Sequence, residues 1–316
     1  MLSIVLGSNN PFLNLAAEDY LLHNRTEDFF ILSINDPVVV IGKHQVAHRE
    51  INTRYIEENK IPVIRRISGG GAVYHDRGNL NFAFIRKSEP GKQVDFRLYT
   101  QPVIDFLHSV GVNAVFEGKN DITSGGLKIS GNAEHVFREK VLHHGTLLFD
   151  ASLEHLRMAL RATTENYSTK AVESNRSPVV NLKDRISNIK DIDLLASSML
   201  EYMSITNDSV VPFTMSQEEI SAVQQLSQAK YRTWEWNWGY GPPYTFTNLF
   251  KVNGKAHHCR LVVRDGIIWE CVIEGSKEMS LIAKKLIGCK HMFHDLSAAF
   301  RTGNISISEE DVYGFF

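Results

Sequence analysis

The chain has 316 residues, of which 43% are hydrophobic and 22% are charged, and its formal net charge is −2. This composition is typical of a soluble globular protein with one large domain and a smaller one. It argues against a nucleic-acid-binding protein, which would show a basic excess. It also argues against a membrane protein, because no apolar run approaches the roughly 20 residues that span a bilayer as a helix.

The N-terminal segment, residues 1–12, carries neither a basic stretch nor a cleavage-like site, and it does not read as an Arg-rich transit segment. We therefore expect no targeting signal and a cytoplasmic protein. The cysteines are Cys259, Cys271 and Cys289, all in the last quarter of the chain. So few thiols fit a reducing compartment without structural disulfides.

Helix and strand signals alternate over residues 10–160. Asn9 or Asn10 followed by Pro11 marks a helix start, and Leu15 and Leu21 belong to its buried face. Runs of β-branched and aromatic residues predict strands at residues 29–34, 38–41, 63–67, 81–85 and 141–149. Further helices are predicted at residues 54–59, 101–110 and 152–160, the last with Ser152 as its cap.

The second half begins with a polar, Ser/Asn-rich stretch at residues 165–191, which predicts a long loop that is either functional or disordered. A helix is predicted at residues 216–229, and the Gly/Pro-rich break at residues 239–243 predicts a boundary between domains 1–240 and 241–316. In the second domain we expect strands at 245–251, 259–263 and 267–273, with a turn at Asp265-Gly266, and helices at 277–286 and 294–300. The predicted class is α+β with mixed sheets.

A glycine cluster, Gly69-Gly70-Gly71, follows the strand that ends in Arg65-Arg66-Ile67. Consecutive glycines let the backbone approach a ligand and offer N–H groups to phosphate or carboxylate oxygens. Arg65 and Arg66 can supply bidentate bonds to an anion. The alternative is a tight turn flanked by solvated arginines. The segment has neither a Walker spacing nor GxGxxG, so it predicts no P-loop and no dinucleotide site.

Two further segments carry polar candidates. Asp121, in Gly118-Lys119-Asn120-Asp121, is a plausible magnesium ligand because hard cations take carboxylates and substrate phosphates. Lys128 lies among apolar and small residues, where one positive charge can serve both a carboxylate and a phosphate. The alternative is a lysine on an edge strand that faces solvent.

The histidines suggest cavity walls more than metal sites. His143 and His144 are adjacent on a predicted strand, so they point to opposite faces and do not readily share a metal. We expect one of them to line a cavity. Cys289, His291 and His294 form a second cluster, but no other ligand pair has the standard spacing of a zinc site.

Together these segments resemble the lipoate–protein ligase family, in the right order through residue ~240. The family patterns and their positions here are RR-x-SGGGAV-[FY]-HD at 65–76, G-[RK]-ND at 118–121, K-[IV]-SG-x-A at 128–133 and HHGTLL at 143–148. Flanking similarities are N-L-A-x-E at 14–18, P-x-VVIG-x-x-Q at 37–45, a loop end at 177–182 and a domain end at 233–236. Ile67 departs from a frequent third arginine, while Arg65 and Arg66 remain.

The resemblance implies a large mixed-sheet domain similar to that of biotin protein ligases, with a small α+β C-terminal accessory domain. It implies ATP and Mg²⁺ as cofactors, lipoic acid as substrate, Lys128 as the catalytic residue and Asp121 as the magnesium ligand. The implied ATP or adenylate contacts are Arg66, Gly71, Ala72, Val73, Tyr74, Lys128 and Val180. The implied lipoate contacts are Ser68, Gly70, His75, Lys128, His144 and Gly145.

The implied reaction forms lipoyl-AMP and transfers the lipoyl group to a lysine of an acceptor. The acceptors would be lipoyl domains of 2-oxoacid dehydrogenase complexes or the glycine cleavage H protein. An acyltransferase that works through a thioester needs a cysteine in the large domain, and none precedes Cys259. A transferase that uses preformed lipoyl-AMP, or a non-catalytic lipoate-binding protein, stays open as an alternative.

Overall fold

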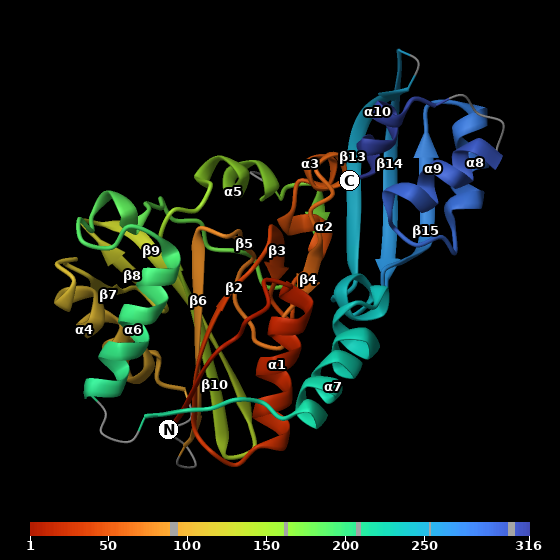
Figure 1. Cartoon of the computed structure of the whole chain (residues 1–316). Helices are drawn as coiled ribbons and strands as arrows, with labels where there is room; N and C mark the ends of the chain where they lie inside the picture. The colour runs from red at the N-terminus through yellow and green to blue at the C-terminus, as the bar shows by residue number, and fades with distance from the viewer. Residues whose placement is uncertain (89–93, 161–163, 207–209, 253, 303–306) are drawn as a thin grey trace.

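A mixed eight-stranded sheet runs through the larger part of the molecule (Figure 1). The computed structural model describes residues 1–88, 94–160, 164–206, 210–252, 254–302 and 307–316. The strand order is β12 (Val211–Pro212), β1 (Leu2–Val5), β2 (Phe29–Ile34), β6 (Asn79–Lys87), β10 (Lys140–Leu148), β9 (Leu127–Phe137), β8 (Asp121–Ser124) and β7 (Val115–Glu117). β1 is parallel to both of its neighbours, and the other pairs are antiparallel.

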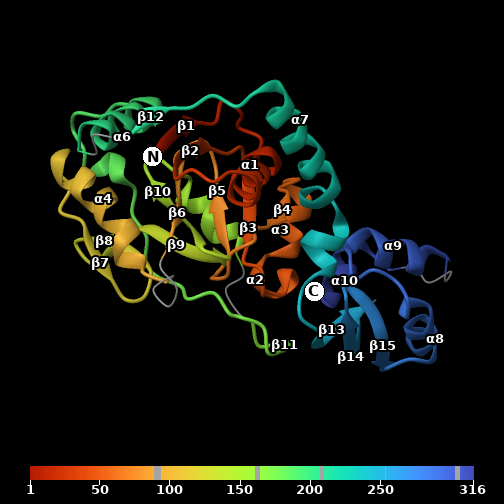
Figure 2. The same cartoon turned by 90° about the horizontal axis from the view of Figure 1, so that it is seen from below.

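Both faces of this sheet are buried, because successive side chains of a strand point to opposite sides. In β2, Phe30 and Leu32 join the core beneath α4 (Phe96–Ser109) and α6 (Ile192–Thr206). Phe29 and Ile31 face the other way, toward the core that contains residues of α1 (Pro11–Asn24) and α7 (Gln217–Leu226). Figure 2 shows the two helix pairs on opposite sides of the strands.

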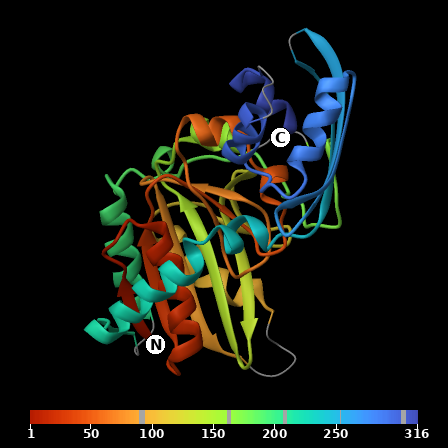
Figure 3. The same ribbon diagram turned by 90° about the vertical axis from the view of Figure 1, so that its right-hand side faces the viewer.

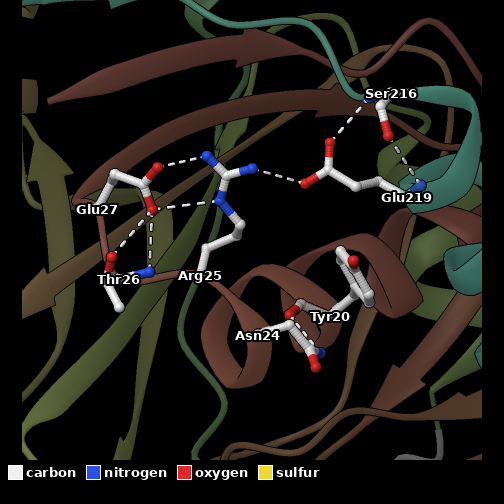
Figure 4. Close-up of polar contacts among 7 residues, drawn as sticks. All are labelled: Tyr20, Asn24, Arg25, Thr26, Glu27, Ser216 and Glu219. Atoms are coloured by element: carbon white, nitrogen blue, oxygen red, sulfur yellow. Dashed lines mark hydrogen bonds and ion pairs between the residues drawn. The ribbon is translucent and has the colours of Figure 1, made fainter.

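Helices α1 and α7 lie side by side (Figures 1 and 3). The side chain of Asn10 caps α1, and a capping box between Ser216 and Glu219 begins α7. Arg25, just after α1, links the two helices: its Nη1 lies 2.8 Å from Glu219 Oε1, and its other nitrogens contact Glu27 (Figure 4). Local capping and one ion pair thus fix the angle at which this helix layer covers the sheet.

A second, three-stranded sheet carries the glycine cluster. Its order is β4 (Val63–Arg65), β3 (Val38–Ile41) and β5 (Val73–His75), so the glycines lie in the connection from β4 to β5. Three short helices pack nearby: α2 (Ala47–Glu50), α3 (Thr53–Glu58) and α5 (Leu153–Ala159).

The C-terminal part is built on a four-stranded sheet, which we call the accessory sheet. Its order is β11 (Tyr167–Ser168), β13 (Tyr244–Val252), β14 (Lys255–Arg264) and β15 (Ile267–Glu274). Its helical elements are α8 (Lys277–Leu286), α9 (Phe293–Thr302), α10 (Glu309–Val312) and η4 (Tyr313–Phe315). Because β11 comes from the long loop of the first 240 residues, that loop contributes an edge strand to this sheet.

The predicted elements agree closely with this structure. The strands at 29–34 and 38–41, the helix at 277–286 and the Asp265-Gly266 turn, with φ of 50° and 70°, are confirmed. The predicted loop at 165–191 contains only β11 and η1 (Leu182–Asp184). The predicted helix at 216–229 continues from α7 into η2 (Ser227–Tyr231), and η3 (Glu235–Gly239) leads to the accessory sheet.

Helix α6 has no counterpart among the predicted elements. Its buried residues Leu195, Ala196, Met199 and Met203 recur at helical spacing, so the sequence did carry the signal. In the described residues, no helix has both the length and the apolar character needed to cross a membrane.

Candidate active site

A cavity of about 340 Å³ lies between the large sheet, the glycine cluster and the long loop. Its wall includes α1, the glycine cluster, β5, the turn before β8, strands β9 and β10, and the loop residues Val172, Glu173 and Asn175. Most of the predicted site residues line it. These are Arg66, Gly70, Gly71, Ala72, Val73, His75, Asp121, Lys128, His144 and Gly145.

Three predicted site residues lie outside the wall of this cavity: Ser68, Tyr74 and Val180. Ser68 is fully buried behind the wall. The ring of Tyr74 packs in the core with Val39 and Ile41, since β5 alternates and Val73 and His75 take the cavity side. Val180 packs against the core of the large sheet and reaches the site only through its backbone. The expected contact of Tyr74 with ATP or an adenylate stays a prediction, although its ring does not line the cavity.

Arg66 organises the glycine cluster from inside. Its Nε donates to Ser68 Oγ (2.9 Å), and its Nη2 donates to the carbonyls of Gly69 and Gly71 (2.8 Å for Gly71). Gly70 has a φ of +85°, and a Cβ there would lie 2.9 Å from Arg66 Nη2. Burial lowers the pKa of Arg66 to about 10, and the Glu18 carboxylate opposes that shift, so the guanidinium stays charged at neutral pH.

A chain of hydrogen bonds continues from Arg66 to α1. His144 Nε2 lies 2.6 Å from Ser68 Oγ, and His144 Nδ1 lies 2.7 Å from Glu18 Oε2. Because a carboxylate only accepts, the Nδ1 proton of His144 donates to Glu18, and Nε2 accepts from Ser68. Each group in the chain is satisfied, so the positive charge of Arg66 is held in one place without an exposed counter-ion.

His75 is held as a neutral imidazole. Its Nδ1 lies 3.1 Å from the amide nitrogen of Asn35, and Asn35 is itself fixed by Asn14 Nδ2 (2.8 Å). Burial lowers the pKa of His75 to about 3, and Arg66 adds to the effect. With Nδ1 accepting from Asn35, the proton sits on Nε2, which has no hydrogen-bond partner among the residues that the structure describes.

Lys128 and Asp121 form an ion pair in the cavity wall, with Nζ 2.8 Å from Oδ1. The Lys128 side chain bends over Gly131, where a Cβ would lie 3.0 Å from its Cε. Strand β9 lies between β8 and β10, so the edge-strand interpretation of Lys128 is wrong. The ammonium is retained inside the cavity by a carboxylate that a substrate anion can replace.

The end of the long loop is bonded to Lys128 through its backbone. Lys128 N donates to Pro178 O (2.9 Å), and Val180 N donates to Lys128 O (3.0 Å). Ser177 Oγ also lies 3.4 Å from Asp121 Oδ2. The end of the loop therefore contacts both members of the Lys128–Asp121 ion pair.

Arg65 does not bind an anion in this arrangement, which corrects one expectation. It has no exposed surface, and its guanidinium donates to five backbone carbonyls. These belong to Gly42, Lys43, Gln45, Trp236 and Asn237. Neither arginine is solvated, so the interpretation as a plain turn with solvated arginines is wrong as well.

The adjacent histidines point to opposite faces, as expected. His143 turns away from the cavity, with Nδ1 2.9 Å from Glu134 Oε1. Burial lowers the pKa of His143 to about 3. Burial also raises the pKa of the Glu134 carboxyl to about 7. Within the described residues, no group of three or more His, Cys, Asp or Glu side chains is arranged to hold a metal ion. His291 instead bonds Tyr244 and the carbonyl of Phe315.

Several polar residues of the site were not assigned a role from the sequence: Asn14, Glu18, Asn35, Gln45 and Ser174. Asn14, Glu18 and Gln45 are named letters of the resemblance motifs at 14–18 and 37–45, so a signal existed for them. Asn35 and Ser174 lie in turn or loop segments where nothing local distinguishes them. Their roles depend on partners far along the chain.

Comparison with known proteins shows the family of the chain. Residues 10–204 match the model of the "Lipoyl protein ligase A/B catalytic domain" family. Lipoate-protein ligase LplJ of Bacillus subtilis is 36% identical over 288 residues, 89% of this chain and 87% of that protein.

Two solved structures are also similar. The first is a putative lipoate protein ligase from T. acidophilum with bound lipoic acid: TM-score 0.64, 27% identity, 75% of this chain and 98% of that chain. The second is a lipoate-protein ligase A bound with ATP. Its TM-score is 0.62 and its sequence identity is 27%, and the match covers 76% of this chain and 97% of that chain.

The chain therefore belongs to the lipoyl protein ligase A/B family. Within it, the protein is a lipoate–protein ligase, an enzyme that joins lipoate to proteins.

Proposed function

We propose that this one cavity carries out both half-reactions, formation of lipoyl-AMP and transfer of the lipoyl group. The observation that carries the proposal is the Lys128–Asp121 pair in a wall shared with the glycine cluster. The ammonium of Lys128 faces the lipoate carboxylate and the α-phosphate, where negative charge develops during attack on phosphorus. A preorganised positive charge at that place lowers the barrier.

The glycine cluster supplies the second element. The backbone of Gly70, Gly71 and Ala72 lines the cavity, and Arg66 holds it from behind with its charge intact. Close backbone approach and N–H groups suit phosphate oxygens. His75 and His144, with Gly145, form the part of the wall that we assign to lipoate, together with Ser68 as the link to Arg66.

Gly145 lets β10 lie close to its neighbouring strands beside this part of the wall. A Cβ at that position would lie 2.1 Å from Asn132 Oδ1 and 2.5 Å from Phe82 Cζ. A larger residue would therefore displace β9 or β6, whose residues Asn132 and Phe82 it would meet.

Asp121 fits the role of magnesium ligand. Mg²⁺ binds through one or two carboxylates plus substrate phosphates, so a lone wall carboxylate is a sufficient protein ligand. The ion would supply charge neutralisation for the departing pyrophosphate. Release of Asp121 from Lys128 would free both groups for these tasks.

In the second half-reaction, the neutral amine of the acceptor lysine attacks the carbonyl carbon of the mixed anhydride, and AMP leaves. We infer that the acceptors are lipoyl domains of 2-oxoacid dehydrogenase complexes or the glycine cleavage H protein. We also infer a cytoplasmic enzyme, supported by three free thiols.

Lipoate-dependent exchange of labelled pyrophosphate into ATP tests the first half-reaction. We expect exchange with wild-type protein, Mg²⁺ and lipoate, and transfer to an apo lipoyl domain when the domain is added. Transfer from supplied lipoyl-AMP without exchange would make the protein a transferase. Lipoate binding with neither activity would make it a binding protein.

A further inference from the structure

The middle of the long loop is fastened to the glycine cluster by a single side chain, Ser174. Its Oγ accepts from the backbone N–H of Ala72 (2.8 Å) and from Gln45 Nε2 (3.0 Å), and it donates to Glu50 Oε2. A hydroxyl offers one donor and two acceptor sites, so all of its capacity is used. Ser174 is half-buried, while the neighbouring residues 172, 173, 175 and 176 are exposed.

Gln45 connects the same hydroxyl to a second turn. Its Oε1 accepts from Gly42 N (2.8 Å) while its Nε2 donates to Ser174. Gly42 packs against the glycine cluster, because a Cβ on it would lie 2.1 Å from Gly70 O. The Ser174 hydroxyl thus joins the loop to Ala72, next to the glycine cluster, and through Gln45 to the turn at Gly42.

The contact is also close in a steric sense. A Cβ on Gly71 would lie 3.1 Å from Cα, Cβ and Oγ of Ser174. The loop on either side contributes Val172, Glu173 and Asn175 to the cavity wall. The position of these loop residues therefore determines whether that side of the cavity is closed.

The contacts before Ser174 hold the loop to residues 44–50, and the loop end beyond it is bonded to Lys128 through Pro178 and Val180. Val172 N donates to His44 O (3.2 Å), and Arg49 binds Ala171 O and the Glu173 carboxylate. These partners all belong to residues 44–50 and none to the glycine cluster. The link from the loop to the cluster depends on Ser174.

We propose that Ser174, positioned by Gln45 and Glu50, is the latch that keeps the loop closed over the acyl-adenylate and so keeps water from it. The proposal rests on the function proposed above. Without the latch, a water oxygen bonds to the lipoyl carbonyl carbon, the bond from that carbon to the phosphate oxygen breaks and AMP leaves. The water proton goes to solvent, and lipoate is released instead of transferred.

Two readouts on the full chain test this. The first is hydrogen–deuterium exchange of residues 172–176 without ligands. The second is AMP release with ATP, Mg²⁺ and lipoate but no acceptor, divided by the rate of transfer when an apo lipoyl domain is added. Ser174→Ala should raise both roughly tenfold, the size expected from losing a net hydrogen bond with its unsatisfied partners.

Two further variants sharpen the result. Gln45→Glu keeps the acceptor for Gly42 N but removes the donor to Ser174, so it should reproduce both effects. Ser168→Ala is the matched control, since Ser168 is an exposed serine of the same loop on β11. It should leave both readouts at the wild-type level.

Unchanged loop exchange and AMP release in folded Ser174→Ala and Gln45→Glu would overturn the latch, while pyrophosphate exchange by the wild type would leave the ligase function intact. If the wild type shows no pyrophosphate exchange, the ligase function fails, and the loop exchange of the variants still decides for or against the latch. If Ser174→Ala does not fold, Gln45→Glu decides.

Discussion

Two regions of the molecule bury their side chains in different ways. Around the cavity, charged and polar groups such as Glu18, Arg65, Arg66 and His75 are buried and bonded to one another or to backbone carbonyls. In the described residues beyond 240, the buried polar side chains are His257, His291 and Ser297, within a core of aliphatic and aromatic groups.

The difference follows from what each region does. Charges that act on a substrate must be present before it arrives and must be shielded from water, so each needs a fixed partner in the protein. The core of the accessory sheet is held mainly by buried apolar area, and this interaction is non-directional. Substitutions near the cavity should therefore change activity more than those in the accessory part, and four predictions test this.

The largest effect should come from Lys128. Lys128→Ala should lower transfer about 10²–10³-fold, the usual cost of removing one preorganised charge. The loss should appear with lipoate plus ATP and also with supplied lipoyl-AMP, because the carboxyl carbon and α-phosphate persist in both. Asp121→Ala should fail with ATP yet still transfer from lipoyl-AMP.

Lys183→Ala is the control for this pair of assays. Lys183 forms an ion pair with Asp150 outside the cavity wall, so its removal should leave both rates unchanged. Thermal melting of each variant must first show that it is folded. Wild-type transfer from lipoyl-AMP by folded Lys128→Ala would restrict Lys128 to adenylation.

A smaller effect is expected at Gly42. Gly42→Ala would place a Cβ 2.1 Å from Gly70 O, a backbone atom that cannot rotate away. We expect the free energy of unfolding to fall by about 1–3 kcal/mol, as for an overpacked core, with loss of lipoate-dependent activity. Gly7→Ala, with nothing within 4 Å of the added Cβ, is the control. Equal chemical denaturation midpoints for the two variants would contradict the close packing of the two turns.

Acid should weaken both regions through their neutral histidines. Burial lowers the pKa of His75 to about 3 and that of His291 to about 4. As the pH falls below 6.5, these histidines become protonated in the unfolded chain but stay neutral in the folded chain. The free energy of unfolding therefore falls. Between pH 6.5 and 5, each histidine should lower the free energy of unfolding by about 1.5 kcal/mol.

Denaturation at a series of pH values checks this. His75→Gln and His291→Gln should each flatten the pH dependence, whereas only His75→Gln should lower transfer activity at pH 7. An unchanged slope in either variant would show that the histidine titrates normally in the folded protein. A fall in activity from His291→Gln as large as that from His75→Gln would remove the functional difference between the regions.

The smallest effect on transfer activity is expected from the thiols. Cys259 and Cys271 lie in the core of the accessory sheet, Cys289 packs against it, and none lines the cavity. Replacing all three by serine should leave transfer within a few-fold, with a loss of stability of about 1–3 kcal/mol for each buried hydroxyl left without a partner. Transfer assays on the folded triple variant check it. Complete loss of transfer would revive a thioester mechanism.

Much of the fold was predictable because its signals are local. The helix start at Asn10-Pro11, the strand at 29–34 and the turn at Asp265-Gly266 each depend on residues a few positions apart. The motif segments were predictable in the same way, as contiguous letters. The domain boundary at 240 stays a prediction, and β11 shows why: a two-residue strand that joins the accessory sheet from residue 167 leaves no local pattern.

The sequence by itself determined which segments are predicted to carry the chemistry, with Lys128, Asp121 and the glycine cluster among them. Tertiary structure alone decided their arrangement. Arg65 and Arg66 are adjacent and chemically identical, yet Arg65 donates to a cage of backbone carbonyls while Arg66 lines the cavity and bonds the glycine cluster. Glu18 with His144 and Gln45 with Ser174 are pairs more than 120 residues apart. A hydrogen bond requires two groups within about 3 Å, and only the folded chain brings them that close.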